Sequence, residues 1–112
     1  MMPISFPRRA AAVAYVLLLG TGAASAAAPQ PVTVRIDNFT FTPAELSVPA
    51  GTTVTWVNGD DIPHTVVAVD KSFRSKALDT GDSYSQTLSA PGTFAYFCGL
   101  HPHMTGRITV TP

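Results

Sequence analysis

Apolar and polar residues alternate along much of the chain from residue 32 onward. Val32, Val34 and Ile36 are separated by polar residues, and Val54 and Trp56 share one face of the β-branched segment 52–58. A period of two is typical of strands that bury one face. Further short apolar segments, bounded by Gly and Pro, lie at 46–48, 66–69, 84–88, 93–98 and 107–111. About seven short strands without a helical period predict an all-β sandwich.

Two segments depart from this regular pattern. Phe39 and Phe41 continue the apolar positions one residue out of phase, which predicts a bulge or bend near Asn38. Residues 71–82 show the weakest pattern, and we expect the loosest part of the domain there, with room for a single helical turn.

The N-terminal segment has the features of a secretory signal peptide. Arg8 and Arg9 precede an apolar run at residues 10–19, and residues 24–26 read Ala-Ser-Ala, an A-x-A processing site. We therefore predict a signal peptide at residues 1–26, a mature domain at residues 27–112, and export to a bacterial periplasm. The alternative is an uncleaved membrane anchor, although the clear apolar run is short for a membrane span.

Charge excludes some partners of the mature domain. Cleavage after residue 26 leaves seven acidic and five basic residues, a net charge of −2. Such a balanced charge does not favour nucleic acid or an anionic membrane as the partner. Three of the basic residues, Lys71, Arg74 and Lys76, lie close together in the sequence. They form either a patch for an acidic partner or a solvated loop.

The chain contains a single cysteine, Cys98, so the predicted domain has no internal disulfide. An odd cysteine in an exported protein is buried, pairs with another chain, or binds a metal. Its neighbours favour the metal: residues 98–104 read Cys-Gly-Leu-His-Pro-His-Met, and His64 precedes an upstream strand. One thiolate, two imidazoles and a weak thioether are the ligands of a type 1 blue-copper centre. We predict one copper ion, held by His64, Cys98, His101 and Met104.

The same residues resemble a known family. The segment 97–104, the segment 54–58 followed by Pro63 and His64, and the segment 41–46 are similar to the small cupredoxins, with amicyanin the most similar and plastocyanin related. This resemblance covers nearly all of the mature chain. It implies a Greek-key β-sandwich, equatorial ligands His64, Cys98 and His101, and a weak axial ligand Met104. It also implies that Asn58 braces the ligand loops near the sulfur; the alternative is an ordinary turn residue in Asn-Gly.

The ligand loop departs from amicyanin at two positions. Leu100 replaces a proline, so its N–H is available and is expected to donate to the Cys98 sulfur and raise the reduction potential. His103 stands where an aromatic residue is expected and is an alternative ligand to His101. The spacing in the family favours His101, and we expect His103 to be exposed.

These features predict an electron carrier and not an enzyme. We expect it to act as a monomer that exchanges one electron at a time with redox proteins, such as a dehydrogenase, a cytochrome c or a reductase. The alternative function is a periplasmic copper carrier or resistance protein, although such proteins tend to use Met or His ligands without a thiolate. Structural zinc sites favour Cys and His without Met, so zinc is disfavoured.

Overall fold

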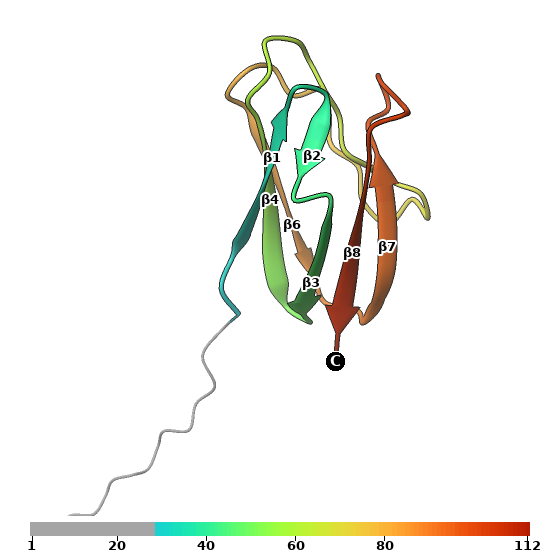
Figure 1. The fold of residues 1–112 in the computed structure, drawn as a ribbon. Helices are drawn as coiled ribbons and strands as arrows, with labels where there is room; N and C mark the ends of the chain where they lie inside the picture. The colour runs from blue at the N-terminus through green and yellow to red at the C-terminus, as the bar shows by residue number, and fades with distance from the viewer. Residues whose placement is uncertain (1–28) are drawn as a thin grey trace, which may run out of the picture.

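The computed structural model describes residues 29–112, which form two four-stranded sheets packed face to face (Figure 1). The first sheet has the order β2-β1-β4-β6, with bounds β1 (Val32–Asp37), β2 (Thr40–Thr42), β4 (Thr52–Asn58) and β6 (Ser83–Leu88). The second has the order β3-β8-β7-β5, with bounds β3 (Glu45–Pro49), β5 (Val67–Ala68), β7 (Gly92–Phe97) and β8 (Thr105–Thr111). The prediction of an all-β sandwich is confirmed.

No helix occurs among residues 29–112, and hence none there that is long and apolar enough to cross a membrane. The predicted signal peptide and its cleavage site lie outside the described residues.

The alternating side chains fill the space between the sheets. Val34 and Ile36 of β1 and Val54 of β4 are fully buried, as predicted, and the second sheet contributes its own apolar face. Trp56 lies at the centre, where its ring packs 5.4 Å from Tyr96 and 5.7 Å from Phe73, measured between centroids. Burial of these apolar faces is the main force that holds the two sheets together.

The irregularity near Asn38 is a two-residue turn. Asn38 and Phe39 have positive φ angles of 51° and 57°, and β1 and β2 pair antiparallel on either side of them. Two successive left-handed residues match the twist of a tight hairpin. The turn explains the change of phase: Phe41 is buried in the core, whereas Phe39 remains 49% exposed at the tip.

Residues 71–82 are more ordered than the sequence predicts. The N–H of Ser75 donates to Val66 O, and Leu78 exchanges two backbone hydrogen bonds with His64. Phe73 and Leu78 are buried in the core. The segment therefore runs extended beside residues 64–68, because its buried side chains hold it there. It contains no helical turn.

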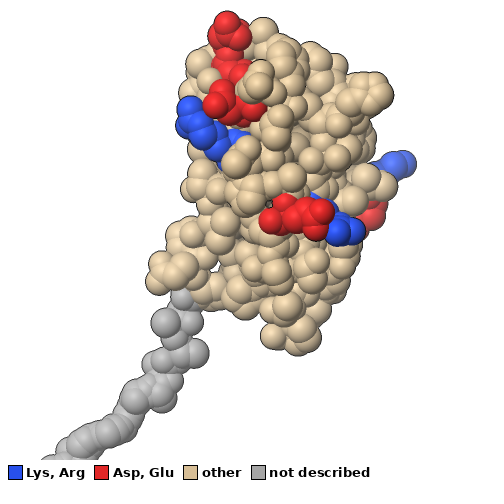
Figure 2. Space-filling model, viewed as in Figure 1, with Lys and Arg blue, Asp and Glu red and all other residues tan. Residues whose placement is uncertain are grey.

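Three connections meet at the end of the sandwich opposite the C-terminus: the β1–β2 turn, the loop after β4 and the loop between β7 and β8 (Figure 1). On the face shown in Figure 2, acidic side chains gather near this end, and most of the remaining surface is uncharged.

Candidate metal centre

The loop between β7 and β8 is closed by its own backbone. Cys98 directly follows β7, and its N–H donates to Met104 O at 3.1 Å. The N–H of His101 donates to Cys98 O at 3.2 Å, and the N–H of Met104 donates to His101 O at 2.9 Å. Cys98 and Met104 are buried, and His101 is partly exposed. A seven-residue segment thus carries three predicted ligands on one tightly closed loop.

The fourth predicted ligand comes from the loop after β4. The ring of His64 is fully buried, and backbone hydrogen bonds of 3.1 and 2.7 Å to Leu78 fix its main chain. These bonds attach the loop to the ordered segment 71–82. His64 is therefore held as firmly as a strand residue, although it lies outside any strand.

The donor atoms of His64, Cys98 and His101 all lie within 4.8 Å of one another. Cys98 Sγ is 3.6 Å from His64 Nδ1 and 3.8 Å from His101 Nδ1. For a first-row metal about 2.1 Å from nitrogen and 2.3 Å from sulfur, tetrahedral or trigonal angles separate the donors by about 3.6–3.8 Å. The spacing thus fits one shared ion. With Met104 buried in the same loop, the donor set is that of type 1 copper, and copper is the cofactor.

The Cys98 sulfur accepts from Thr65, which follows the His64 ligand. The Thr65 N–H lies 3.3 Å from Sγ and its hydroxyl lies 4.0 Å away. Gly99 N–H in turn donates to Thr65 Oγ1 at 2.6 Å. Among residues 29–112, Leu100 N–H makes no hydrogen bond to the sulfur. Thr65 N–H makes the hydrogen bond that was predicted for Leu100.

Asn58 braces the loop that carries His64, and its side-chain hydrogen bonds go to that loop and to Leu78. Its amide group donates to Ile62 O at 2.9 Å and Leu78 O at 2.8 Å, and its oxygen accepts from the N–H of Asp60. Asn58 is fully buried. The bracing role is therefore found, together with the local turn of the alternative interpretation.

Asp60 was not identified from the sequence, yet it contacts a predicted ligand directly. Its carboxylate accepts from His64 Nε2 at 2.8 Å, from Asn38 N–H at 2.6 Å and from Phe39 N–H at 2.9 Å. These donors, chiefly the Phe39 N–H, hold the pKa of Asp60 below its ordinary value against the opposing effect of burial. The group is therefore a carboxylate at neutral pH.

Phe39 covers the two histidines. Its ring meets His64 edge-on at 5.5 Å and His101 at 5.1 Å, measured between centroids. A surface hollow of about 410 Å³ lies beside it, lined by Phe39, Leu100, His101, Pro102, His103 and Met104. Leu100 is 51% exposed in this hollow. His103 is exposed, as predicted, and the ligand group contains His101 in preference to it.

The basic residues lie elsewhere. Lys71 and Arg74 line a separate hollow of about 300 Å³ with Val69 and Phe97. Lys76 is exposed. Within residues 29–112 none of the three basic side chains forms an ion pair.

Comparison with known proteins agrees with the fold and the centre. The family model for the cupredoxin-like domain matches residues 9–110. Amicyanin-alpha of Methylorubrum extorquens is 32% identical, over 98% of this chain and 99% of that protein. Plastocyanin of Scenedesmus fuscus is 37% identical, over 62% of this chain and 85% of that protein. A solved purple cupredoxin from Nitrosopumilus maritimus has a TM-score of 0.69 and 32% identity, over 71% of this chain and 99% of that one. The chain therefore belongs to the cupredoxin-like family.

Proposed function

We propose that the chain is an exported electron carrier that transfers one electron at a time between redox proteins. In this proposal His64, Cys98 and His101 are the equatorial ligands of one type 1 copper, and Met104 is the weak axial ligand. The observation that carries the proposal is the convergence of one sulfur and two Nδ1 atoms from two different loops.

The residues around the centre resist movement. When bound, copper supplies a Cu(II)/Cu(I) couple, which a thiolate–imidazole donor set accommodates in both states. Cys98 is anchored at the end of β7, and Asn58 ties the His64 loop to the core through two side-chain donations. Thr65, the residue after His64 in the same loop, donates its N–H to the sulfur. A donor set that is already held in place needs little rearrangement when the charge changes.

The partly exposed His101 gives the electron a route to the surface. It lies in the apolar hollow beside Phe39, Leu100 and Pro102. Small apolar contacts of this kind suit brief encounters between redox proteins. We propose that the donor and acceptor dock here, whether they are a dehydrogenase, a cytochrome c or a reductase, and that the carrier acts as a monomer.

Export forms a separate part of the proposal. Residues 1–26 act as the signal peptide, and residues 27–112 form the mature periplasmic domain. The basic start, apolar run and small-residue site support this assignment. Mass spectrometry of the protein recovered from a periplasmic fraction would give a chain that begins at residue 27. A chain retained in the membrane with its N-terminus intact would contradict export by cleavage.

Electrochemistry separates an electron carrier from a copper delivery or resistance protein. Within residues 29–112 the group spaced for a metal consists of His64, Cys98 and His101, a thiolate and two imidazoles. We expect copper-loaded protein to give one reversible one-electron wave in voltammetry and to keep its copper through repeated cycles. Loss of copper on reduction, without a reversible wave, would favour the delivery protein.

A further inference from the structure

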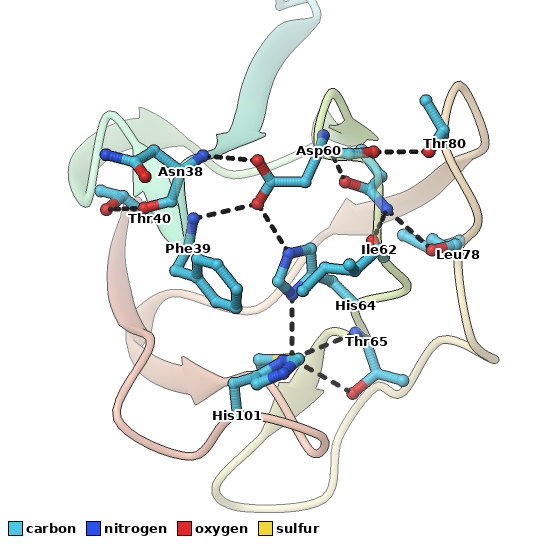
Figure 3. Close-up of polar contacts among 12 residues, drawn as sticks. Asn38, Phe39, Thr40, Asp60, Ile62, His64, Thr65, Leu78, Thr80 and His101 are labelled. Carbon is cyan, nitrogen blue, oxygen red and sulfur yellow. Dashed lines mark hydrogen bonds and ion pairs between the residues drawn. The ribbon is translucent and has the colours of Figure 1, made fainter.

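The Asp60 carboxylate connects the β1–β2 turn to the His64 side chain of its own loop. Figure 3 shows it between the backbone of the β1–β2 turn and the imidazole of His64. Oδ1 accepts from Asn38 N–H, and Oδ2 accepts from both Phe39 N–H and His64 Nε2. Its side chain is 12% exposed, so these contacts are largely shielded from water.

The backbone of Asp60 is itself anchored. Its N–H donates to Asn58 Oδ1 at 2.9 Å, and its carbonyl accepts from the Thr80 hydroxyl at 2.6 Å. The preceding Gly59 has no room for a side chain, because a Cβ there would lie 3.1 Å from Ile36 O and closer still to the Arg35 guanidinium. These contacts fix the backbone of Asp60, and they therefore set the position from which its carboxylate meets its partners.

This contact determines which nitrogen of His64 carries the proton. A carboxylate only accepts hydrogen bonds, so the nitrogen that faces it must be the donor. Nε2 is therefore protonated, and the lone pair is left on Nδ1, which lies 3.6 Å from Cys98 Sγ. The geometry selects the tautomer in which Nδ1 is available to a metal.

The same oxygen also orients Phe39. Because Oδ2 accepts from its N–H, the left-handed turn is fixed at the point from which the Phe39 ring reaches both imidazoles. Asp60 thereby connects the inner side of the centre, at His64, to the exposed ring at the surface.

We propose that Asp60 is a positioning residue with two linked effects: it fixes the Nε2–H tautomer of His64, and it holds Phe39 over His64 and His101. The proposal rests on the proposed function in that His64 is taken as a ligand. Carboxylates that accept from a ligating imidazole raise its basicity, and their loss typically weakens metal binding by about 10- to 100-fold.

The first test uses the metal-free protein. Nitrogen-15 NMR of the imidazoles at about pH 8, above the ordinary His pKa, reports the tautomer directly. We expect wild type to show His64 protonated at Nε2, and Asp60→Ala to show a mixture of tautomers together with faster hydrogen exchange at the Phe39 amide. An Nδ1–H tautomer in wild type would overturn the proposal without any variant.

Two further variants separate positioning from charge. In Asp60→Asn the amide oxygen can occupy the place of Oδ2 and keep the bonds from Phe39 and His64, so we expect the wild-type tautomer to persist. The amide NH2 then replaces Oδ1, and only the hydrogen bond from Asn38 N–H is lost. Asp61→Ala removes the same charge one residue away, at an exposed side chain that makes no hydrogen bond among residues 29–112. It should leave the tautomer and the Phe39 amide unchanged. If Asp61→Ala matched Asp60→Ala, the loss of charge alone would be the cause and the proposal would fail.

The second test uses titration with Cu(II) and measurement of the potential. We expect Asp60→Ala to bind Cu(II) about 10- to 100-fold more weakly than wild type and to have a higher reduction potential, because a less basic imidazole favours Cu(II) less. Unchanged affinity and tautomer in Asp60→Ala would overturn the proposal while leaving the electron carrier intact. Conversely, a wild-type protein without a reversible copper wave would contradict the proposed function, whereas the tautomer result would stand.

Discussion

Replacement of Gly99 by Ala tests the contact between the two ligand loops. Gly99 follows Cys98, and a Cβ at this position would lie 2.9 Å from Thr65 Oγ1. The next neighbour, Val67 Cγ2, lies at 3.5 Å, an ordinary contact distance. The φ of Gly99 is outside the left-handed region, so alanine adds no backbone strain. The effect of the substitution therefore comes from Thr65 alone.

The loss of stability depends on whether the Thr65 hydroxyl shifts or rotates to make room for the new methyl group. Thr65 Oγ1 must move by about half an ångström, and overpacking of this kind typically costs about 1–3 kcal/mol. Rotation of the hydroxyl away avoids the overlap, but it breaks the 2.6 Å hydrogen bond from Gly99 N–H, worth about 1 kcal/mol. We therefore expect Gly99→Ala to lower the free energy of unfolding by about 1–2 kcal/mol.

A double-mutant cycle isolates this contact. Urea unfolding of the metal-free protein would be measured for wild type, Gly99→Ala, Thr65→Ala and the double variant. In the Thr65→Ala background the overlapping oxygen is absent, so Gly99→Ala should cost about 0.5 kcal/mol or less, a coupling of about 1 kcal/mol. An equal cost in both backgrounds would refute the reasoning, since the overlap would then not involve Thr65.

Two further predictions concern aromatic residues. Burial raises the pKa of Tyr96, so the unfolded chain ionises first and stability should fall as pH rises above about 10. The Tyr96 hydroxyl is buried without a hydrogen-bond partner. Tyr96→Phe should therefore leave the free energy of unfolding at pH 7 unchanged or raise it by about 1 kcal/mol, and it should reduce the loss of stability above about pH 10. A clear destabilisation in urea would contradict this. Because Phe39 has a φ of 57°, Phe39→Gly should be more stable than Phe39→Ala by about 1 kcal/mol in thermal unfolding. Equal stabilities of these two variants would show that the turn relaxes.

The strands and the ligand group could be predicted from the sequence because their signals are local. The alternation in 32–37 and 52–58 gives the inward faces of β1 and β4, with Trp56 on the buried side. The residues of the ligand loop lie within seven positions, so their chemistry is visible without the fold. His64 could be predicted because a type 1 centre needs a second imidazole beside His101, and His64 supplies it from another loop.

The residues around the ligands could not be predicted in the same way. Asp60 meets Phe39 across 21 positions of sequence, and Thr65 meets Cys98 across 33. Their roles depend on how closely two connections approach at one end of the sandwich, and no local pattern encodes that distance. Asp60 lies four residues before His64, which is a weak signal, since acidic residues are common in turns. The sequence predicts Leu100 N–H as the donor to the sulfur because Leu100 is close to Cys98 in the chain, whereas the observed donor, Thr65 N–H, comes from a different loop.

The central claim is that the Cys98 thiolate and two imidazoles hold one copper ion whose charge changes by one. The most direct measurement is the visible absorption spectrum of copper-loaded residues 27–112, compared with that of Cys98→Ser. We expect wild type to show an intense visible band that disappears on one-electron reduction and returns on oxidation, and Cys98→Ser to lack it. A variant that binds copper and keeps the same band would contradict the claim, because serine oxygen cannot supply a thiolate–copper transition.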